Sequence, residues 1–172
     1  IGMVFQEPMT SLDPLFRIGE QMLEPIVHHQ KISRKAAQAK ALELLNLVQI
    51  PEPERRMRAY PHELSGGQRQ RIMIALAIAN NPDLLIADEP TTALDVTIQA
   101  QILMLLKSLQ QRLGMALVFI THDLRVAAQI CNRVVVLQHG RVVEHGPLAD
   151  VFHNPRHEYT RALLQAAPGR DL

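Results

Sequence analysis

Apolar residues in this sequence first form a short run, then take a helical spacing, and finally alternate between short runs and longer helical stretches. Residues 1–5 are an apolar run that predicts a buried strand. Residues 16–49 have a helical period, in which Ser33 is a suitable N-cap and Pro25 is expected to kink or end the first helix. The turn-rich stretch 6–14 separates the strand from this helical block.

The second half of the chain predicts strands that alternate with helices. Residues 96–113 form a long amphipathic stretch that Gly114 should end, and a short tail helix is expected at 158–167. The residues 138–141 predict the turn of a β-hairpin. The strand-like runs are 84–87, 116–120, 134–137 and 142–143. This order predicts an α/β fold whose mostly parallel sheet is covered on both sides, with an antiparallel addition at its end.

Composition narrows the class of protein. A length of 172 residues suits one compact domain, and 47% hydrophobic with 20% charged residues exclude a disordered chain. The net charge of +1 gives no reason to expect nucleic acid as a partner. A single cysteine, Cys131, excludes an internal disulfide and favours a reducing compartment. No apolar run reaches the roughly 18 residues that cross a bilayer, and the apolar start lacks the basic region of a signal peptide, so we expect the chain to begin inside a fold.

Two adjacent carboxylates follow the apolar run 84–87. Asp88 and Glu89 should lie at the carboxyl end of a strand, where ligands of open α/β folds bind. Asp88 suits magnesium, which prefers oxygen ligands, and Glu89 suits a base or a group that orients water in phosphoryl transfer. Taken alone, the pair is equally compatible with solvated acids that end a strand.

The sequence Leu-Ser-Gly-Gly-Gln at 64–68 precedes a further helical stretch. The Ser65 hydroxyl, the backbone of Gly66 and Gly67, and the first amides of the helix at Gln68 could together bind an anion. Taken alone, such a turn is more often an ordinary loop before a helix.

His122 and Gln6 also follow strand-like runs. His122 comes directly after the run 116–120, and Gln6 ends the run 1–5, so both should lie at the same sheet edge as the two acids. Each also has a non-functional explanation: His122 could be a structural imidazole, and Gln6 could be a surface amide.

The order and spacing of these motifs resemble one family, the ATP-binding cassette ATPases, over essentially the whole chain. Gln6 resembles the Q-loop glutamine, 64–68 the signature motif and 84–89 the Walker B strand with its catalytic glutamate. Residues 93–95, Ala-Leu-Asp, resemble the D-loop, and His122 resembles the switch histidine.

The resemblance implies ATP and Mg²⁺ as cofactors, held between two such domains that pair head to tail. Ser65, Gly66, Gly67 and Gln68 would contact the γ-phosphate of the ATP held by the opposite subunit, and Asp95 would lie at the dimer seam.

In the same resemblance, Glu89 would polarise the attacking water and His122 would hold the γ-phosphate. Asp88 and Gln6 would take part in binding magnesium, and Gln6 would also sense the transmembrane partner.

The implied fold is a partial P-loop NTPase core of RecA-like type with an inserted helical subdomain. None of the eight glycines is followed by lysine, so the P-loop is missing. We therefore expect an N-terminally truncated domain without its N-terminal β-subdomain and Walker A strand, which the resemblance places beside the strand that ends at Asp88.

Such a chain is expected neither to bind ATP tightly nor to hydrolyse it alone. Whether it is an enzyme by itself therefore stays open. The expected parts are a strand and Q-loop at 1–14, a helical signature subdomain at 15–65, the remaining catalytic core at 66–155 and a tail helix at 156–172.

A narrower likeness concerns partners. Residues 5–14 and 154–164 are similar to segments of the ATPase subunits of peptide and nickel importers. This implies uptake of peptides or a similar small solute at the cytoplasmic face of the cell membrane. The partners would be permease subunits, bound through the Q-loop and the helical block, and indirectly an extracytoplasmic solute-binding protein, without nucleic acid.

Three alternatives stay open. The chain could be a non-hydrolysing subunit that supplies its signature motif in trans to an intact partner. It could be a cassette protein of translation or DNA repair, which the near-neutral charge disfavours. It could also be an incomplete chain without activity of its own.

Overall fold

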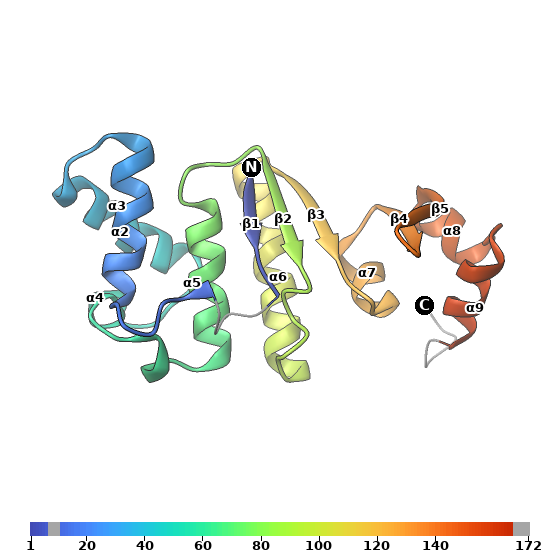
Figure 1. Ribbon diagram of the computed structural model, residues 1–172, viewed down its shortest axis with the longest axis horizontal. Helices are drawn as coiled ribbons and strands as arrows, with labels where there is room; N and C mark the ends of the chain where they lie inside the picture. Colours follow the sequence, from blue (N-terminus) through green and yellow to red (C-terminus); the bar gives the residue numbers. More distant parts are fainter. Residues whose placement is uncertain (7–10, 167–172) are drawn as a thin grey trace. The chain divides into compact units, whose positions relative to one another are not determined.

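The computed structural model describes residues 1–6 and 11–166 and divides into two compact units, Ile1–Ile120 and Thr121–Leu172 (Figure 1). Residues 7–10 of the expected Q-loop and residues 167–172 of the expected tail lie outside the described residues. Within the described part, no helix is long and apolar enough to cross a membrane.

A parallel sheet of three strands forms the centre of the first unit. The strands are β1 (Gly2–Val4), β2 (Leu84–Asp88) and β3 (Ala116–Ile120), in the order β1-β2-β3. Ala87 pairs with Val4 on one side and with Phe119 on the other. The strand that ends in Asp88 is therefore central, and the expectation that a P-loop strand lies beside it is wrong because both of its edges are occupied.

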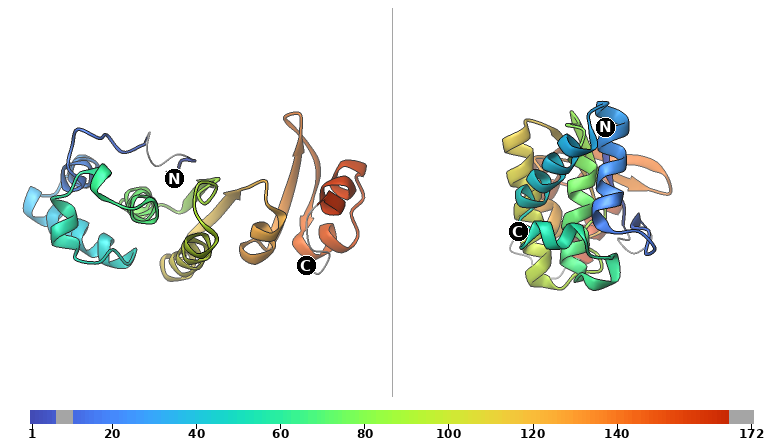
Figure 2. Two further views of the ribbon diagram at one scale, coloured as in Figure 1. Left: turned by 90° about the horizontal axis from the view of Figure 1, so that it is seen from below. Right: turned by 90° about the vertical axis from the view of Figure 1, so that its left-hand side faces the viewer.

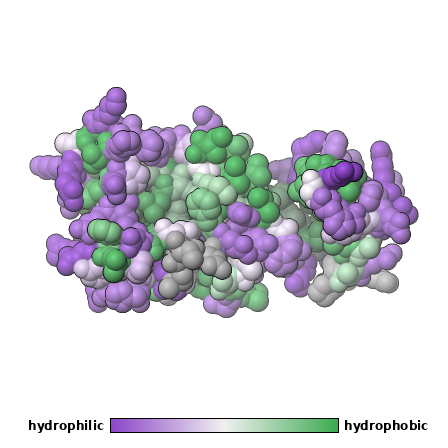
Figure 3. Space-filling model, in the orientation of Figure 1, coloured by the Kyte–Doolittle hydropathy of each residue, from purple (hydrophilic) through white to green (hydrophobic). Residues whose placement is uncertain are grey.

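The two faces of this sheet differ in burial. Val4, Leu85 and Ala87 are fully buried on one face, along which α6 (Val96–Leu113) runs (Figures 1 and 2). On the other face Val118 is 46% and Ile120 45% exposed, and hydrophobic side chains are visible over the strands in Figure 3. The expected covering of both faces is thus wrong within this unit. An all-apolar strand does not reveal whether one or both faces are covered.

The helical block follows β1, and its helices pack around one hydrophobic core. Its fully buried side chains include Ile18, Met22, Ile26, Leu45 and Ile72. The elements are α2 (Ile18–Gln30), α3 (Arg34–Leu47), α4 (Pro53–Met57), the 3₁₀ turn η1 (Pro61–Glu63) and α5 (Gly66–Ile78).

Pro25 lies inside α2, and the helix does not end there. A proline in a helix interior costs about 3 kcal/mol because a backbone hydrogen bond is lost. Met22 and Ile26, which flank it on the buried face, are fully buried. Their packing offsets this local penalty.

The predicted helix ends are confirmed. The Ser33 hydroxyl accepts a hydrogen bond from the Ala36 N–H at 3.2 Å and so caps α3. Gly114 ends α6 with a φ of 63°, in the left-handed region that favours glycine. Both signals are local in sequence, which is why they could be recognised without the fold.

The second unit contains a β-hairpin and three helices. The elements are α7 (Leu124–Ile130), β4 (Arg133–Gln138), β5 (Arg141–Pro147), α8 (Leu148–His153) and α9 (Glu158–Ala166). His139 and Gly140 form the two-residue turn with φ values of 49° and 75°, as primed hairpin turns require. The hairpin is confirmed, but its strands form a sheet of their own instead of an addition to the parallel sheet.

Glu144 on β5 fastens the segment that leads into α9. Its carboxylate accepts the N–H of Arg156 at 2.8 Å and the N–H of His157 at 3.1 Å. The Arg156 bond is the largest cause that lowers the pKa of Glu144 to about 2. The buried Thr160 hydroxyl also favours the charged form, but it lacks regular hydrogen-bond geometry, so we ascribe the anchoring to the two backbone donors.

We predict that this anchor is lost in acid. The pKa of Glu144 is lower in the folded chain than its ordinary value of 4.5, so its contribution to stability is complete above about pH 4.5 and disappears as the pH falls through about 2. Amide hydrogen exchange should show protection of Arg156 and His157 falling over this range. Glu144→Gln should reduce this protection already at pH 7, whereas Glu43→Gln on α3 should not. Unchanged protection in Glu144→Gln would contradict the assignment.

Candidate functional site

Glu89 occupies a strained position at the carboxyl end of β2. Its φ is 44°, which is rare for a residue with a side chain, and the next residue is Pro90. Its backbone N–H donates to the Ile120 carbonyl at 3.0 Å, so the end of β3 holds this conformation in place. Backbone strain of this kind costs about 1–3 kcal/mol and is concentrated at functional positions.

Two side chains donate to the same oxygen of the Glu89 carboxylate. Gln6 Nε2 donates to Oε2 at 3.2 Å, and Thr92 Oγ1 donates to it at 2.7 Å. Gln6 follows β1, which pairs in parallel with β2, so the sheet brings together residues 83 positions apart in the sequence. The predicted convergence of Gln6 and Glu89 at one sheet edge is therefore present in the structure.

Asp88 and Gln6 are the two residues that the sequence predicted to take part in binding magnesium. Among the described residues, no group of three His, Cys, Asp or Glu side chains could hold a metal ion. Magnesium usually takes one or two carboxylates and completes its shell with water and substrate phosphates. Asp88 is half-buried at the last position of β2, and its carboxylate could be one of these ligands. Because the Gln6 amide nitrogen serves Glu89, its oxygen Oε1 is the atom suited to a cation.

Ser65 and Gln68 form a reciprocal capping box at the start of α5. The Ser65 hydroxyl accepts the Gln68 N–H at 3.2 Å, and the Gln68 side chain accepts the Ser65 N–H at 3.1 Å. Helix geometry leaves the first N–H groups, those of Gly66 and Gly67, without an acceptor inside the helix. The start of α5 thus presents amide donors, as the sequence predicted for an anion site.

The two glycines of this motif are not equivalent. A Cβ on Gly67 would lie 2.8 Å from Ile98 Cγ2, so glycine is needed there for α5 to approach α6. A Cβ on Gly66 would meet Leu94 Cδ2 at 3.6 Å and Arg69 Nη2 at 4.0 Å, which are ordinary contacts. Asp95 caps α6 by accepting the Ile98 N–H at 2.9 Å, so Gly67 and Asp95 both contact the same residue of α6.

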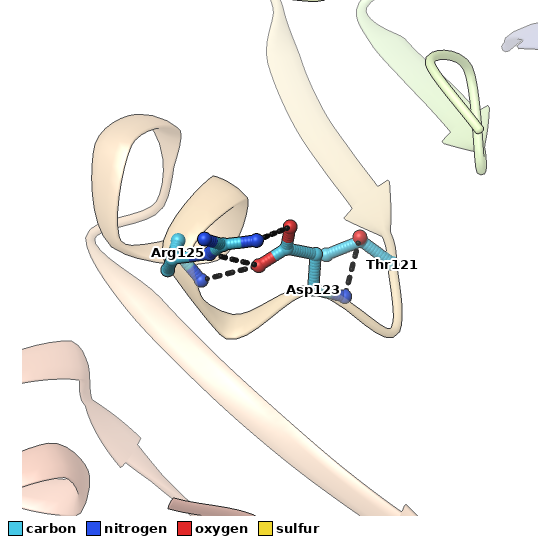
Figure 4. A network of polar contacts seen from close by, with 3 residues as sticks. All are labelled: Thr121, Asp123 and Arg125. Carbon is cyan, nitrogen blue, oxygen red and sulfur yellow. Dashed lines mark hydrogen bonds and ion pairs between the residues drawn. The ribbon is translucent and has the colours of Figure 1, made fainter. Parts of the chain in front are cut away.

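His122 lies in the second unit, in the turn that starts α7. Its neighbour Asp123 caps α7 and is bound by Arg125 through two side-chain contacts of 3.2 and 3.3 Å, while Thr121 Oγ1 accepts the Asp123 N–H at 3.0 Å (Figure 4). Partial burial acts to raise the pKa of Asp123, but its hydrogen bonds with Arg125 outweigh this, and the pKa lies below the ordinary value. His122 is exposed within this unit, and its role beside Glu89 stays a prediction.

A groove in the helical block lies outside the motifs. The Gln21 side chain fixes the preceding turn by accepting the Asp13 N–H at 2.9 Å and donating to the carbonyls of Asp13 and Phe16 at 2.9 and 2.8 Å. This turn borders a groove of about 900 Å³ on α2. Side chains that line it include Phe16, Glu20, Glu24, Val27 and Leu76.

Thr92, whose hydroxyl donates to Glu89, is a residue of this sheet edge that the sequence did not predict as part of the site. The available signal was its hydroxyl, placed three residues after Glu89 in a turn, where Ser and Thr side chains commonly bond back to nearby groups. Its use by a carboxylate could not be inferred without the turn geometry.

Comparison with known proteins decides the family. The model of the ABC transporter family matches residues 1–92, more than half of the chain. This chain belongs to the ABC transporter family. The match includes β1, the helical block, and β2 with the Glu89 that follows it.

Curated relatives of this ABC chain are similar along nearly its whole length. A probable peptide ABC transporter ATP-binding protein, y4tR of Sinorhizobium fredii, is 57% identical over 99% of this chain and 51% of its own length. The oligopeptide transport ATP-binding protein OppD of Bacillus subtilis is 56% identical over 98% of this chain and 47% of its own. The chain therefore spans about half the length of these relatives.

The fold of this ABC chain is likewise that of known cassettes. A dimeric structure of the ATP-binding cassette MJ0796, in a post-hydrolysis state bound to ADP and Pi, superposes with a TM-score of 0.73 at 37% identity. The match covers 86% of this chain and 62% of that one. The predicted α/β cassette fold with a parallel sheet and helical insertion is thus confirmed.

We predict that Gly67→Ala destabilises the protein by about 1–2 kcal/mol, because the new Cβ would push α5 away from the stiff side chain of Ile98. Gly66→Ala is the matched control and should be neutral or slightly stabilising. Urea unfolding of the purified protein measures both. Combining Gly67→Ala with Ile98→Ala should cost less than the sum of the single changes. Equal effects of the two glycine substitutions would contradict the packing argument.

Proposed function

We propose that this chain forms the hydrolytic edge and signature motif of an ATPase subunit that powers uptake of peptides or a similar small solute. The observation that carries the proposal is the Glu89 carboxylate, held at the end of the central strand by Gln6 and Thr92. The peptide assignment is supported by relatives of 56–57% identity that are described as peptide and oligopeptide transport proteins.

In this proposal Glu89 orients the attacking water and accepts its proton, a role that its position at the sheet edge permits. Asp88 and the Gln6 amide oxygen would hold Mg²⁺, which neutralises phosphate charge when bound with ATP. His122 would donate to the γ-phosphate through its imidazole.

The start of α5 would act across a head-to-tail dimer. Ser65, Gly66, Gly67 and Gln68 would present hydroxyl, amide and backbone groups to the γ-phosphate of the second ATPase domain, with Asp95 at the seam. The contact between Gly67 and Ile98 supports this arrangement, because it fixes the motif against the helix that Asp95 caps.

The groove on α2 is proposed to receive the permease. Phe16 is 52% exposed beside it. Among the lining side chains, the carboxylates of Asp13, Glu20 and Glu24 outnumber the guanidinium of Arg34, so the wall of the groove is more negative than positive. A short helix with apolar and basic side chains would complement this surface. This would place the protein at the cytoplasmic face of the cell membrane, with a solute-binding protein engaged only through the permease.

A second candidate function follows from the absence of a Gly-Lys-Ser/Thr loop in these 172 residues. Such a chain could supply its signature motif in trans to an intact partner without hydrolysing ATP itself. The capped, presented start of α5 favours this alternative, because it needs nothing from the missing loop.

We predict that Glu89→Gln lowers the ATPase kcat of the complete transporter that contains this chain by about a hundredfold or more, with ATP affinity retained. Glu43→Gln on the surface of α3 is the control and should leave kcat unchanged. The 172-residue chain alone should show no turnover and no tight ATP binding. Turnover by the isolated chain that Glu89→Gln abolishes would refute the second statement, and an active Glu89→Gln transporter would refute the first.

Phe16→Ala should uncouple transport from hydrolysis. Removing this aromatic side chain from the proposed docking groove should reduce solute uptake by about tenfold or more while basal ATPase activity stays within about twofold, since buried aromatic anchors contribute about 2 kcal/mol or more to interfaces. Leu15→Ala, at an adjacent residue that is 79% exposed and does not line the groove, is the matched control. Equal transport defects in both variants would contradict a specific docking role.

A further inference from the structure

The turn after β2 binds the Glu89 side chain to its own backbone loop. Thr92 N–H donates to the Glu89 carbonyl at 3.3 Å, and Thr92 Oγ1 donates to Glu89 Oε2 at 2.7 Å. Thr92 therefore closes the turn with its backbone and hydrogen-bonds the Glu89 carboxylate with its side chain. The distance of 2.7 Å is usual for an O–H···O hydrogen bond.

The hydrogen bond from Gln6 to Glu89 Oε2 is longer than the bond from Thr92, and it comes from a distant segment of the chain. Gln6 Nε2 approaches at 3.2 Å, at the long end for an N–H···O bond, and comes from an exposed residue after β1. Any movement of the segment after β1 would alter the Gln6 contact. The Thr92 contact spans only three residues and would persist, because the Glu89 N–H is fixed to Ile120.

We propose that Thr92 is a positioning residue that holds the Glu89 carboxylate in its reactive orientation when the Gln6 contact changes. The inference rests on the proposed function of Glu89. Without the hydroxyl, the Glu89 carboxylate loses the shorter of these two hydrogen bonds and is held less firmly. Its reacting oxygen then spends less time in the orientation that meets the attacking water. Thr92 does not touch the substrate in this account; it acts through Glu89.

The substitution Thr92→Val tests this with the least change in shape, since valine replaces the hydroxyl with a methyl group. Thr92 is exposed, so the protein should still fold, which the melting temperature checks. Thr92→Ser keeps the hydroxyl and should rescue. Thr97→Val makes the same chemical change at an exposed position in the first turn of α6 and is the matched control.

In the complete transporter, Thr92→Val should lower the ATPase kcat by about tenfold with KM for ATP within about twofold, as expected when only the orientation of a reacting group is lost. Thr92→Ser should stay within about threefold of the parent, and Thr97→Val should equal it. In a Glu89→Gln background, Thr92→Val should cause no further loss, because its effect passes through Glu89.

Three results would overturn the proposal: an unchanged or raised kcat in Thr92→Val, a rise confined to KM, or an equal further loss in the Glu89→Gln background. The failure of the underlying function is distinguishable. If Glu89→Gln itself remains active, the role of Glu89 is wrong; if it is inactive while Thr92→Val is fully active, only the role of Thr92 is wrong.

Discussion

The candidate site depends on the pairing of β2 with a parallel strand on each side. This pairing sets Val4 and Phe119 opposite Ala87, so the chain leaves all three strands at one edge of the sheet. Gln6 can reach Glu89 only because of this register. A shift of one residue would turn every side chain of β1 to the opposite face, so Val4 would no longer be buried beside Ala87. The burial of these apolar residues therefore also fixes the geometry of the polar edge.

The same edge stores strain that the surrounding contacts hold. Glu89 has a positive φ directly before a proline, and the contacts that fix it include its N–H to Ile120 and its carboxylate to Gln6 and Thr92. The first contact belongs to the sheet, the second bridges distant segments and the third lies within the turn. A carboxylate held in this way needs little reorganisation to meet a water molecule, which is the physical basis of catalysis by positioning.

Local signals in the sequence predicted local structure well. The Ser33 cap, the Gly114 helix end and the turn at His139 and Gly140 each depend on a few neighbouring residues, and all three were predicted. Helix α2 continues through Pro25 because distant residues pack against it. This packing cannot be predicted from the residues next to the proline. The central place of β2 was missed for the same reason, since strand order depends on pairings across more than 80 residues.

The site was predictable to the extent that its chemistry resides in residue type and spacing. Gln6 and Glu89 were expected at one edge and meet there, whereas the grip of Thr92 required the conformation of the turn. The two glycines at the start of α5 differ in what the chain requires of them. Gly67 is explained by the contact of α5 with Ile98, whereas the contacts that a Cβ on Gly66 would make are ordinary and do not require glycine. A glycine that internal packing does not require can serve a demand from outside the chain, which under the proposed function is the close approach of the γ-phosphate to the backbone.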